Sequence, residues 1–111
     1  MVHYMNLNKE PFDMIASGKK TIELRLYDEK RRKIKVDDEI VFTSLPDGAK
    51  LNTRVKKLYV FDSFEHLYES LPLDKCGYEQ GEEASPVDME KYYSRERQQA
   101  NGVVGIELDV I

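Results

Sequence analysis

The densest group of chemically useful side chains lies in residues 18–25, which read Gly-Lys-Lys-Thr-Ile-Glu-Leu-Arg. Alternate residues of a strand face the same side, so Thr21, Glu23 and Arg25 would lie next to one another. A carboxylate between cations stays ionised and orients them. An arginine placed in this way can bind a phosphate or a carboxylate through two hydrogen bonds. The alternative is an ordinary strand whose outer face carries exposed ion pairs.

Two lysines precede this strand directly. Lys20 has the parity of the apolar residues Ile22 and Leu24, which places it either in the turn before the strand or near the mouth of a barrel. A partly buried lysine at such a mouth suits the role of a base or a nucleophile. We therefore expect Lys20 and Glu23 to be the catalytic residues if the protein is an enzyme, and Lys19 to contribute to ligand binding.

A second group of cations occupies residues 30–33, Lys-Arg-Arg-Lys, with Lys35 close by. Residues 19–35 contain eight Lys and Arg against three Asp and Glu. Nucleic-acid backbones are bound by Lys and Arg at this kind of density, independently of base sequence. Tyr27 beside the run could stack on a base. We expect Arg31 and Arg32 to flank the binding cleft and contact RNA; the alternative is a solvated loop.

A third candidate is the segment Tyr92-Tyr93-Ser94. Adjacent residues of a helix point about 100° apart, so one tyrosine would lie in the core while the other, Tyr93, faces a cleft. Ser94 could then donate a hydrogen bond to a ligand. The alternative is that both tyrosines serve core packing.

The remaining singletons predict little chemistry. His3 and His66 are far apart and lack partners at ligand spacing, so we expect no metal site. The single Cys76 cannot form an internal disulfide and is interpreted as an incidental thiol. No glycine-rich phosphate loop is present, and no cofactor is expected.

The elements that position these residues follow from hydrophobic periodicity. Alternating or apolar runs predict strands over residues 2–7, 21–26, 39–43, 51–61 and 103–111. Capping and periodicity signals predict helices over residues 8–18, 64–71 and 87–100. Gly105 is expected to form a bulge, and residues 73–85 form the least regular segment, whose movement the sequence leaves open. Strands mixed with short helices favour an α+β domain on a curled sheet or small barrel.

Composition and charge set limits. The 111 residues are 41% hydrophobic and 34% charged, which is typical of one globular domain. No run approaches the roughly 20 apolar residues of a membrane span, and the first residues do not resemble a signal peptide. We therefore expect a cytoplasmic protein with no membrane partner.

The net charge is −4, yet residues 1–60 hold 13 Lys and Arg against 9 Asp and Glu. One positive face is compatible with this distribution.

The residues Gly18, Lys20, Glu23 and Arg25 form the pattern G-x-K-x-x-E-x-R. This pattern resembles the signature of ASCH domains, which belong to the PUA-like superfamily. The resemblance covers almost the whole chain, including the stretches 12–18, 36–42, 92–94 and 102–106. It implies an α+β fold, a small mixed β-barrel with short flanking helices, as a single ASCH domain over residues 1–111. It also implies a cleft, lined by the signature, that binds RNA or nucleotides.

The resemblance implies an enzymatic alternative as well. One group of small bacterial relatives hydrolyses N4-acetylcytidine to cytidine and acetate, using the signature Lys, a Thr at the position of Glu23, and a Glu from a later loop. Lys20 matches the Lys, whereas Glu23 departs from the Thr. Candidates for the later acid are Glu79, Glu82 and Glu83, and the sequence does not choose among them. Other relatives are associated with nuclease activity on RNA.

A second departure from the family pattern lies at Asp37. Most members have Gly before the Asp of a V-G-D stretch, and this change would affect a turn more than a site.

The expected function is therefore binding of RNA or of a modified nucleoside or nucleotide, with Lys20 and Arg25 on its polar edge and Glu23 orienting them. Hydrolysis of an acylated nucleoside is the first alternative. A protein-interaction module, in which the acidic second half of the chain binds a basic partner, is the second. The oligomeric state is left open between a monomer and a weak dimer.

Overall fold

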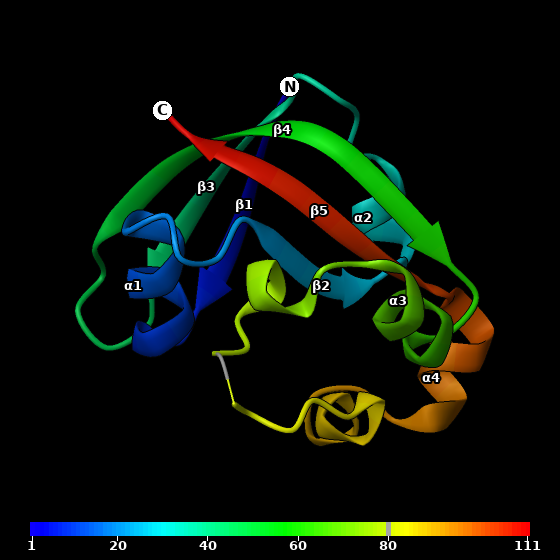
Figure 1. Ribbon diagram of the computed structural model, residues 1–111. Helices are drawn as coiled ribbons and strands as arrows, with labels where there is room; N and C mark the ends of the chain where they lie inside the picture. The colour runs from blue at the N-terminus through cyan, green and yellow to red at the C-terminus, as the bar shows by residue number, and fades with distance from the viewer. Residues whose placement is uncertain (80) are drawn as a thin grey trace.

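The computed structural model describes residues 1–79 and 81–111 and contains one curled sheet of five strands (Figure 1). Strand β1 (Val2–Leu7) pairs in parallel with β3 (Glu39–Ser44). The long strand β4 (Lys50–Phe61) pairs antiparallel with β3 and with β5 (Val103–Val110), and β5 pairs antiparallel with β2 (Ile22–Leu26). The order β1-β3-β4-β5-β2 leaves β1 and β2 as the two edges of a half-barrel. The expected α+β class is confirmed.

Short helices surround this sheet. They are α1 (Lys9–Ala16), α2 (Glu29–Arg32), α3 (Phe64–Ser70), α4 (Arg95–Asn101) and two 3-10 turns, η1 (Leu73–Cys76) and η2 (Pro86–Lys91). Helix α1 packs near β3, whereas α3 packs against β4, β5 and η2. Helices α1 and α3 therefore lie on different sides of β2 (Figure 1). None of the described helices is long and apolar enough to cross a membrane.

Strand β2 lies between two apolar clusters and is covered on both faces. Ile22, Leu24 and Leu26 belong to the cluster that α3 and the 3-10 turns complete. On the other face Glu23 is only 4% exposed. The alternative of an ordinary strand with exposed ion pairs is therefore wrong for Glu23. Its partner in the ladder is Ile106 of β5, which belongs to the other apolar cluster together with Met5, Leu7, Phe12 and Ile15.

Two cations bridge the open side of the half-barrel. The free-edge carbonyl of Asn6 in β1 accepts a hydrogen bond from Nη2 of Arg25 in β2, at 2.9 Å. The next free carbonyl on this edge, that of Tyr4, accepts from Nζ of Lys30 at 2.8 Å. Edge carbonyls need partners, and here Arg25 of β2 and Lys30 of α2 supply them in place of a neighbouring strand.

The helix expected over residues 87–100 is broken in the structure. It consists of η2 and α4, and Ser94 between them caps α4 by accepting a hydrogen bond from the amide of Arg97 at 3.2 Å. Pro86 and a capping box centred on Ser85 start η2. The continuous helix was wrong because a serine with an extended backbone begins a new helix more readily than it continues one.

Gly105 does not form the expected bulge. It pairs in register with Leu24 and Tyr59, and the register shift of this ladder lies between Val55 and Lys57 of β4. A Cβ at position 105 would approach Cδ1 of Leu71 to 2.8 Å, so the missing side chain instead allows α3 to pack closely on the sheet.

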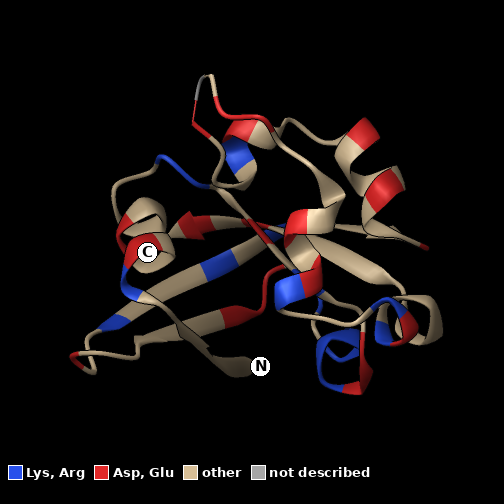
Figure 2. Cartoon of the chain, turned by 90° about the horizontal axis from the view of Figure 1, so that it is seen from below, with Lys and Arg blue, Asp and Glu red and all other residues tan. Residues whose placement is uncertain are grey.

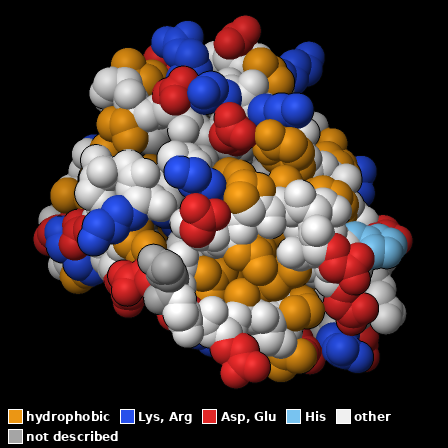
Figure 3. Space-filling view, viewed as in Figure 1, with side chains coloured by type: hydrophobic (Ala, Val, Ile, Leu, Met, Phe, Trp, Pro, Cys, Tyr) orange, Lys and Arg blue, Asp and Glu red, His pale blue; other side chains and the backbone are white. Residues whose placement is uncertain are grey.

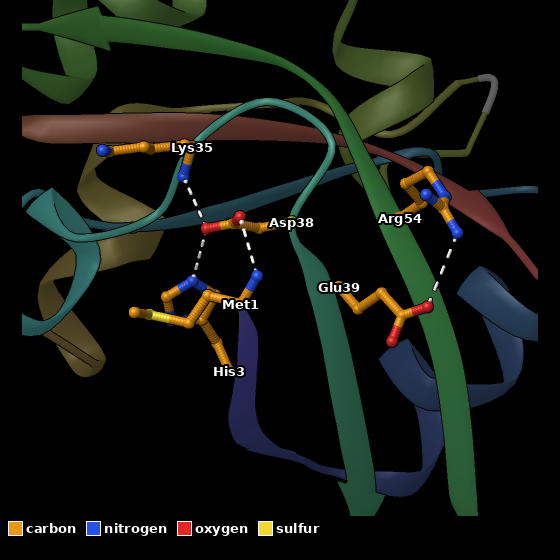
Figure 4. A network of polar contacts seen from close by, with 6 residues as sticks. All are labelled: Met1, His3, Lys35, Asp38, Glu39 and Arg54. Carbon is orange, nitrogen blue, oxygen red and sulfur yellow. Dashed lines mark hydrogen bonds and ion pairs between the residues drawn. The ribbon is translucent and has the colours of Figure 1, made fainter.

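The turn before β3 is held by Asp38, as Figure 4 shows. Its carboxylate contacts Nε2 of His3 at 2.8 Å and the amide of Lys35 at 3.0 Å, and it pairs with the N-terminal amine of Met1 at 3.3 Å. These hydrogen bonds lower the pKa of Asp38 to about 2. The preceding residue, Asp37, has a φ of 76°, so the departure from glycine lies at a left-handed position.

Candidate ligand-binding cleft

Lys20, Glu23 and Arg25 form a buried ion-pair triad. Oε1 of Glu23 lies 2.7 Å from Nζ of Lys20. Oε2 accepts a hydrogen bond from Nε of Arg25 at 2.9 Å and lies 2.8 Å from Nη2 of the same guanidinium. The three side chains are 11%, 5% and 13% exposed, respectively. Both carboxylate oxygens are thus used by cations, as the strand spacing suggested for Arg25.

Burial and charge act in opposite directions on Glu23. Burial alone would raise its pKa, but the neighbouring Lys20 and Arg25 outweigh burial and lower the pKa to about 2. For Arg25, burial opposes the charge, whereas Glu23 and the nearby Tyr93 hydroxyl favour it, and its pKa is raised. The triad therefore carries one net positive charge at neutral pH.

The local backbone explains how Lys20 reaches Glu23 against the strand parity. Gly18 ends α1 with a φ of 83°, and the amide of Lys20 donates to the carbonyl of Met14, so Lys20 lies in the turn before β2. Gly77 makes room for the lysine stem: a Cβ at position 77 would lie 3.3 Å from Cδ of Lys20. The first of the two placements expected for Lys20 is the one observed.

The triad forms the deep part of a cleft of about 640 Å³. Clefts of this size hold small molecules or single nucleotide units. The lining comes from the end of β1, the start of α1, β2, the segment after η1, and η2 with the two tyrosines that follow it. Its charged residues are Glu10, Lys20, Glu23, Arg25, Glu82, Glu83, Asp88 and Lys91. Its amides and aromatic residues are Asn6, Asn8, Tyr68, Tyr78, Tyr92 and Tyr93.

One wall of the cleft is a chain of hydroxyl groups. Tyr68 and Tyr78 share a hydrogen bond of 2.7 Å between their hydroxyls, and Tyr78 donates to Oδ2 of Asp88 at 2.8 Å. Burial, followed by these hydrogen bonds, raises the pKa of Tyr78, so it stays protonated as a donor. The chain joins α3, the segment after η1 and η2. Figure 3 shows hydrophobic side chains gathered near the centre of the face drawn there, with acidic and basic side chains around them.

The structure brings together only some of the site residues expected from the sequence. Lys20, Glu23, Arg25 and Tyr93 line the cleft. The other expected ligand contacts do not line it: Lys19, Thr21, Arg31, Arg32 and Ser94. Thr21 is held in the backbone network of η1 and β5, since its amide donates to Lys75 and its carbonyl accepts from Leu108.

The basic run is used largely by the fold itself. Figure 2 shows Lys and Arg concentrated on α2. Arg31 pairs with Asp28 at 2.8 Å, and Arg32 donates to the carbonyl of Asn101 at 2.8 Å while lying over the ring of Tyr27. Lys33 and Lys35 have exposed side chains without an ion pair among the described residues. The expected role of this run in contacting RNA remains a prediction.

The three glutamates considered as the catalytic acid differ in their position relative to the cleft. Glu82 and Glu83 line the cleft, and Glu79 does not. The amide of Glu79 donates to Oε1 of Glu82 at 2.7 Å, which fixes Glu82 within its own turn. Glu83 is exposed and makes no ion pair in the described part of the chain.

Several lining residues had no sequence signal that marked them as functional. Asn6 and Asn8 read as a strand end and a helix cap, although Asn8 makes no side-chain capping hydrogen bond. Tyr68 and Tyr78 read as core and loop residues.

Cys76, interpreted as incidental, also lines the cleft; burial raises the pKa of its thiol to about 11, so it is not a nucleophile at neutral pH. No group of three His, Cys, Asp or Glu able to hold a metal occurs among residues 1–79 and 81–111.

Comparison with known proteins places this architecture. The model of the ASCH domain family matches residues 5–111. This chain belongs to the ASCH domain family. Its half-barrel with short helices is the PUA-like fold. No curated protein matches the chain.

Solved structures of similar chains agree with this assignment. The hypothetical protein PH0355 is 36% identical, with a TM-score of 0.85 and coverage of 100% of both chains. PF0455 from Pyrococcus furiosus is also 36% identical, with a TM-score of 0.77 and coverage of 100% of this chain and 98% of that one. ASCH from Zymomonas mobilis is 15% identical, with a TM-score of 0.67 and coverage of 97% and 66%. This last likeness concerns the fold alone.

Proposed function

We propose that this ASCH protein binds RNA, or a nucleoside derived from RNA, by taking a base into the cleft over Lys20, Glu23 and Arg25. The observation that carries the proposal is the triad itself, a fixed pair of cationic donors at the bottom of a cleft of about 640 Å³. Membership of the ASCH family supports it.

The cleft offers the contacts that a base needs. A planar base is bound by stacking on aromatic rings and by hydrogen bonds along its edge. Tyr92 and Tyr93 contribute rings, with centroids 6.5 Å apart and planes tilted by 54°. Lys20 and Arg25 contribute donors at the bottom. In this arrangement Glu23 keeps both cations charged and in place.

The test is a titration with a short single-stranded RNA and with free nucleosides, followed by NMR chemical shifts. We expect shifts at Lys20, Arg25 and Tyr93. Lys20→Ala removes one charge-assisted hydrogen bond and should weaken binding by about tenfold. The control Lys50→Ala removes an equal charge from β4, outside the cleft, and thermal melting of both variants confirms the fold. Binding that survives Lys20→Ala unchanged would contradict the proposal and favour the protein-interaction alternative.

The basic run could add backbone contacts if the ligand is RNA. In the described part of the chain, Lys33 and Lys35 are the members whose side chains make neither an ion pair nor a hydrogen bond, so Lys33→Glu/Lys35→Glu tests the run without breaking the contacts of Lys30, Arg31 and Arg32. We expect weaker RNA binding and a flatter salt dependence, by about 0.7 in slope for each phosphate that the variant no longer neutralises. An unchanged slope would remove this run from the interface.

Hydrolysis of an acylated nucleoside is the second candidate, and it is favoured by the presence of Glu82 and Glu83 in the same cleft as Lys20. In this reaction Lys20 would stabilise the developing oxyanion, and a loop carboxyl group would transfer the proton. Chromatography of N4-acetylcytidine incubated with the protein and with Lys20→Ala provides the assay. Cytidine released by the parent alone would establish the enzyme; its absence from both would leave binding as the function.

A further inference from the structure

The charge balance of the cleft is unusual for a protein proposed to bind a phosphorylated ligand. Among the residues that the structure describes, five carboxylates and three cations line it. Sites that bind phosphate groups concentrate Lys, Arg and backbone amides instead. The lining therefore carries two net negative charges at neutral pH, even though the first part of the chain is basic.

The charges are also separated by depth. The positive part is the triad, in which Lys20 and Arg25 are 11% and 13% exposed. The negative part is an acidic margin formed by Glu10, Glu82 and Glu83, which are all exposed; the two other exposed charged residues of the lining, Asp88 and Lys91, have opposite charges that cancel. An ammonium has three N–H groups and a guanidinium five, so Lys20 and the Nη1 group of Arg25 keep donors beyond those that Glu23 and Asn6 accept. Cationic donors are therefore concentrated in the buried part of the lining, and carboxylate acceptors outnumber the one cation, Lys91, in the exposed part.

We propose that the cleft selects an uncharged nucleoside over its phosphorylated forms, with the acidic margin as the specificity determinant. This inference rests on the proposed function and narrows its ligand class. A base carbonyl accepts hydrogen bonds from Lys20 and Arg25, and an exocyclic amine of the same base donates to the carboxylates of the margin. A 5′-phosphate, which extends from the sugar toward the entrance, meets the margin and is repelled.

The amide side chains fit the same ligand. Asn6 and Asn8 line the cleft, and within the described part of the chain neither side-chain amide is used in a hydrogen bond. An amide offers a donor and an acceptor together, which suits the mixed edge of a base and gives no advantage to an anion.

Isothermal titration tests the inference with the full chain. The probes are cytidine, uridine, adenosine and guanosine, each compared with its 5′-monophosphate, at about 20 mM and about 150 mM salt. Two net charges acting on a dianionic phosphate at about 12 Å in a water-like dielectric predict a preference for the nucleoside of about tenfold at low salt. The preference should shrink at the higher salt.

A matched pair of variants assigns the effect to the margin. Glu82→Gln/Glu83→Gln removes two charges at the entrance and should reduce the preference to about twofold, mainly by strengthening binding of the monophosphate. Glu69→Gln/Glu96→Gln removes the same charge from exposed sites on α3 and α4 outside the cleft and should leave the preference near its original value.

The two hypotheses fail differently. If a monophosphate binds as tightly as its nucleoside or more tightly, the selection is wrong, while binding of a base in the cleft stands. An equal response of both double variants also overturns the role of the margin. If neither nucleosides nor monophosphates shift the resonances of Lys20 and Arg25, the proposed function fails and the inference with it.

Discussion

Replacing Glu23 by glutamine should destabilise the protein strongly. The side chain is buried and is the only carboxylate between Lys20 and Arg25 in the described structure. Its pKa falls from 4.5 to about 2 in the folded state. At 1.36 kcal/mol for each pKa unit, this difference corresponds to about 3 kcal/mol. The value agrees with the roughly 3–5 kcal/mol by which removal of one partner of a buried ion pair destabilises a protein.

The pH dependence has a defined sign. A carboxylate with a lowered pKa contributes stability that is fully present above its unfolded pKa of about 4.5 and is lost as the pH falls through about 2. The free energy of unfolding lost in Glu23→Gln should therefore decrease from about 3 kcal/mol at neutral pH to about 1 kcal/mol near pH 3.

Urea denaturation of both proteins at the two pH values measures this difference. Glu39→Gln is the control, because its pair with Arg54 spans 3.5 Å between side chains that are 42% and 48% exposed (Figure 4). Exposed pairs contribute less than about 1 kcal/mol. A loss below about 1 kcal/mol in Glu23→Gln at neutral pH, or a loss that does not change with pH, would refute the electrostatic account of the triad.

Three further substitutions test local features of the fold. Asp37→Gly should raise the free energy of unfolding by about 0.5 kcal/mol, because glycine tolerates the φ of 76° although it makes the unfolded chain more flexible; a lower urea midpoint would contradict this. Gly105→Ala should lower the melting temperature and the free energy by about 2 kcal/mol, because the new Cβ would lie 2.8 Å from Leu71; full stability would show that α3 can move away. Ser94→Ala should lower the free energy by about 1 kcal/mol through loss of the cap on the amide of Arg97, with ligand affinity unchanged, and a large loss of affinity without destabilisation would instead place Ser94 in the site.

The sequence predicts local structure well where the pattern is short-ranged. Strand β3 follows from alternation, and β1 follows from a short run of β-branched, aromatic and apolar residues. Ser63, directly before the helix predicted over residues 64–71, accepts a hydrogen bond from the amide of His66 at 3.2 Å, as an N-terminal cap does. Gly18 ends α1 in the left-handed conformation, as its position indicated. Each of these features depends on contacts within a few residues, which is the range that periodicity and capping describe.

Features that depend on distant segments could not be predicted in this way. Strand parity places Glu23 and Arg25 on one face but does not reveal that this face is covered. The apolar cluster on this side includes Met5 and Leu7 of β1, and one wall of the cleft beside it comes from Tyr68, Tyr78 and Asp88, which form a single hydrogen-bonded chain only in the folded protein. Half of the residues that line the cleft could therefore not be predicted from residues 18–25, which carry the triad.

The bridge between Arg25 and Asn6 has a consequence for changing the ligand of this protein. The same guanidinium neutralises Glu23 and closes the gap between the two sheet edges. The choice of ligand and the connection between β1 and β2 consequently both depend on the side chain of Arg25. A substitution at this position would therefore change both properties at once. Substitutions at the entrance can change the ligand preference alone, because Glu10, Glu82 and Glu83 take no part in joining strands. Variation between related clefts should accordingly concentrate at the entrance, while the deep end stays constant.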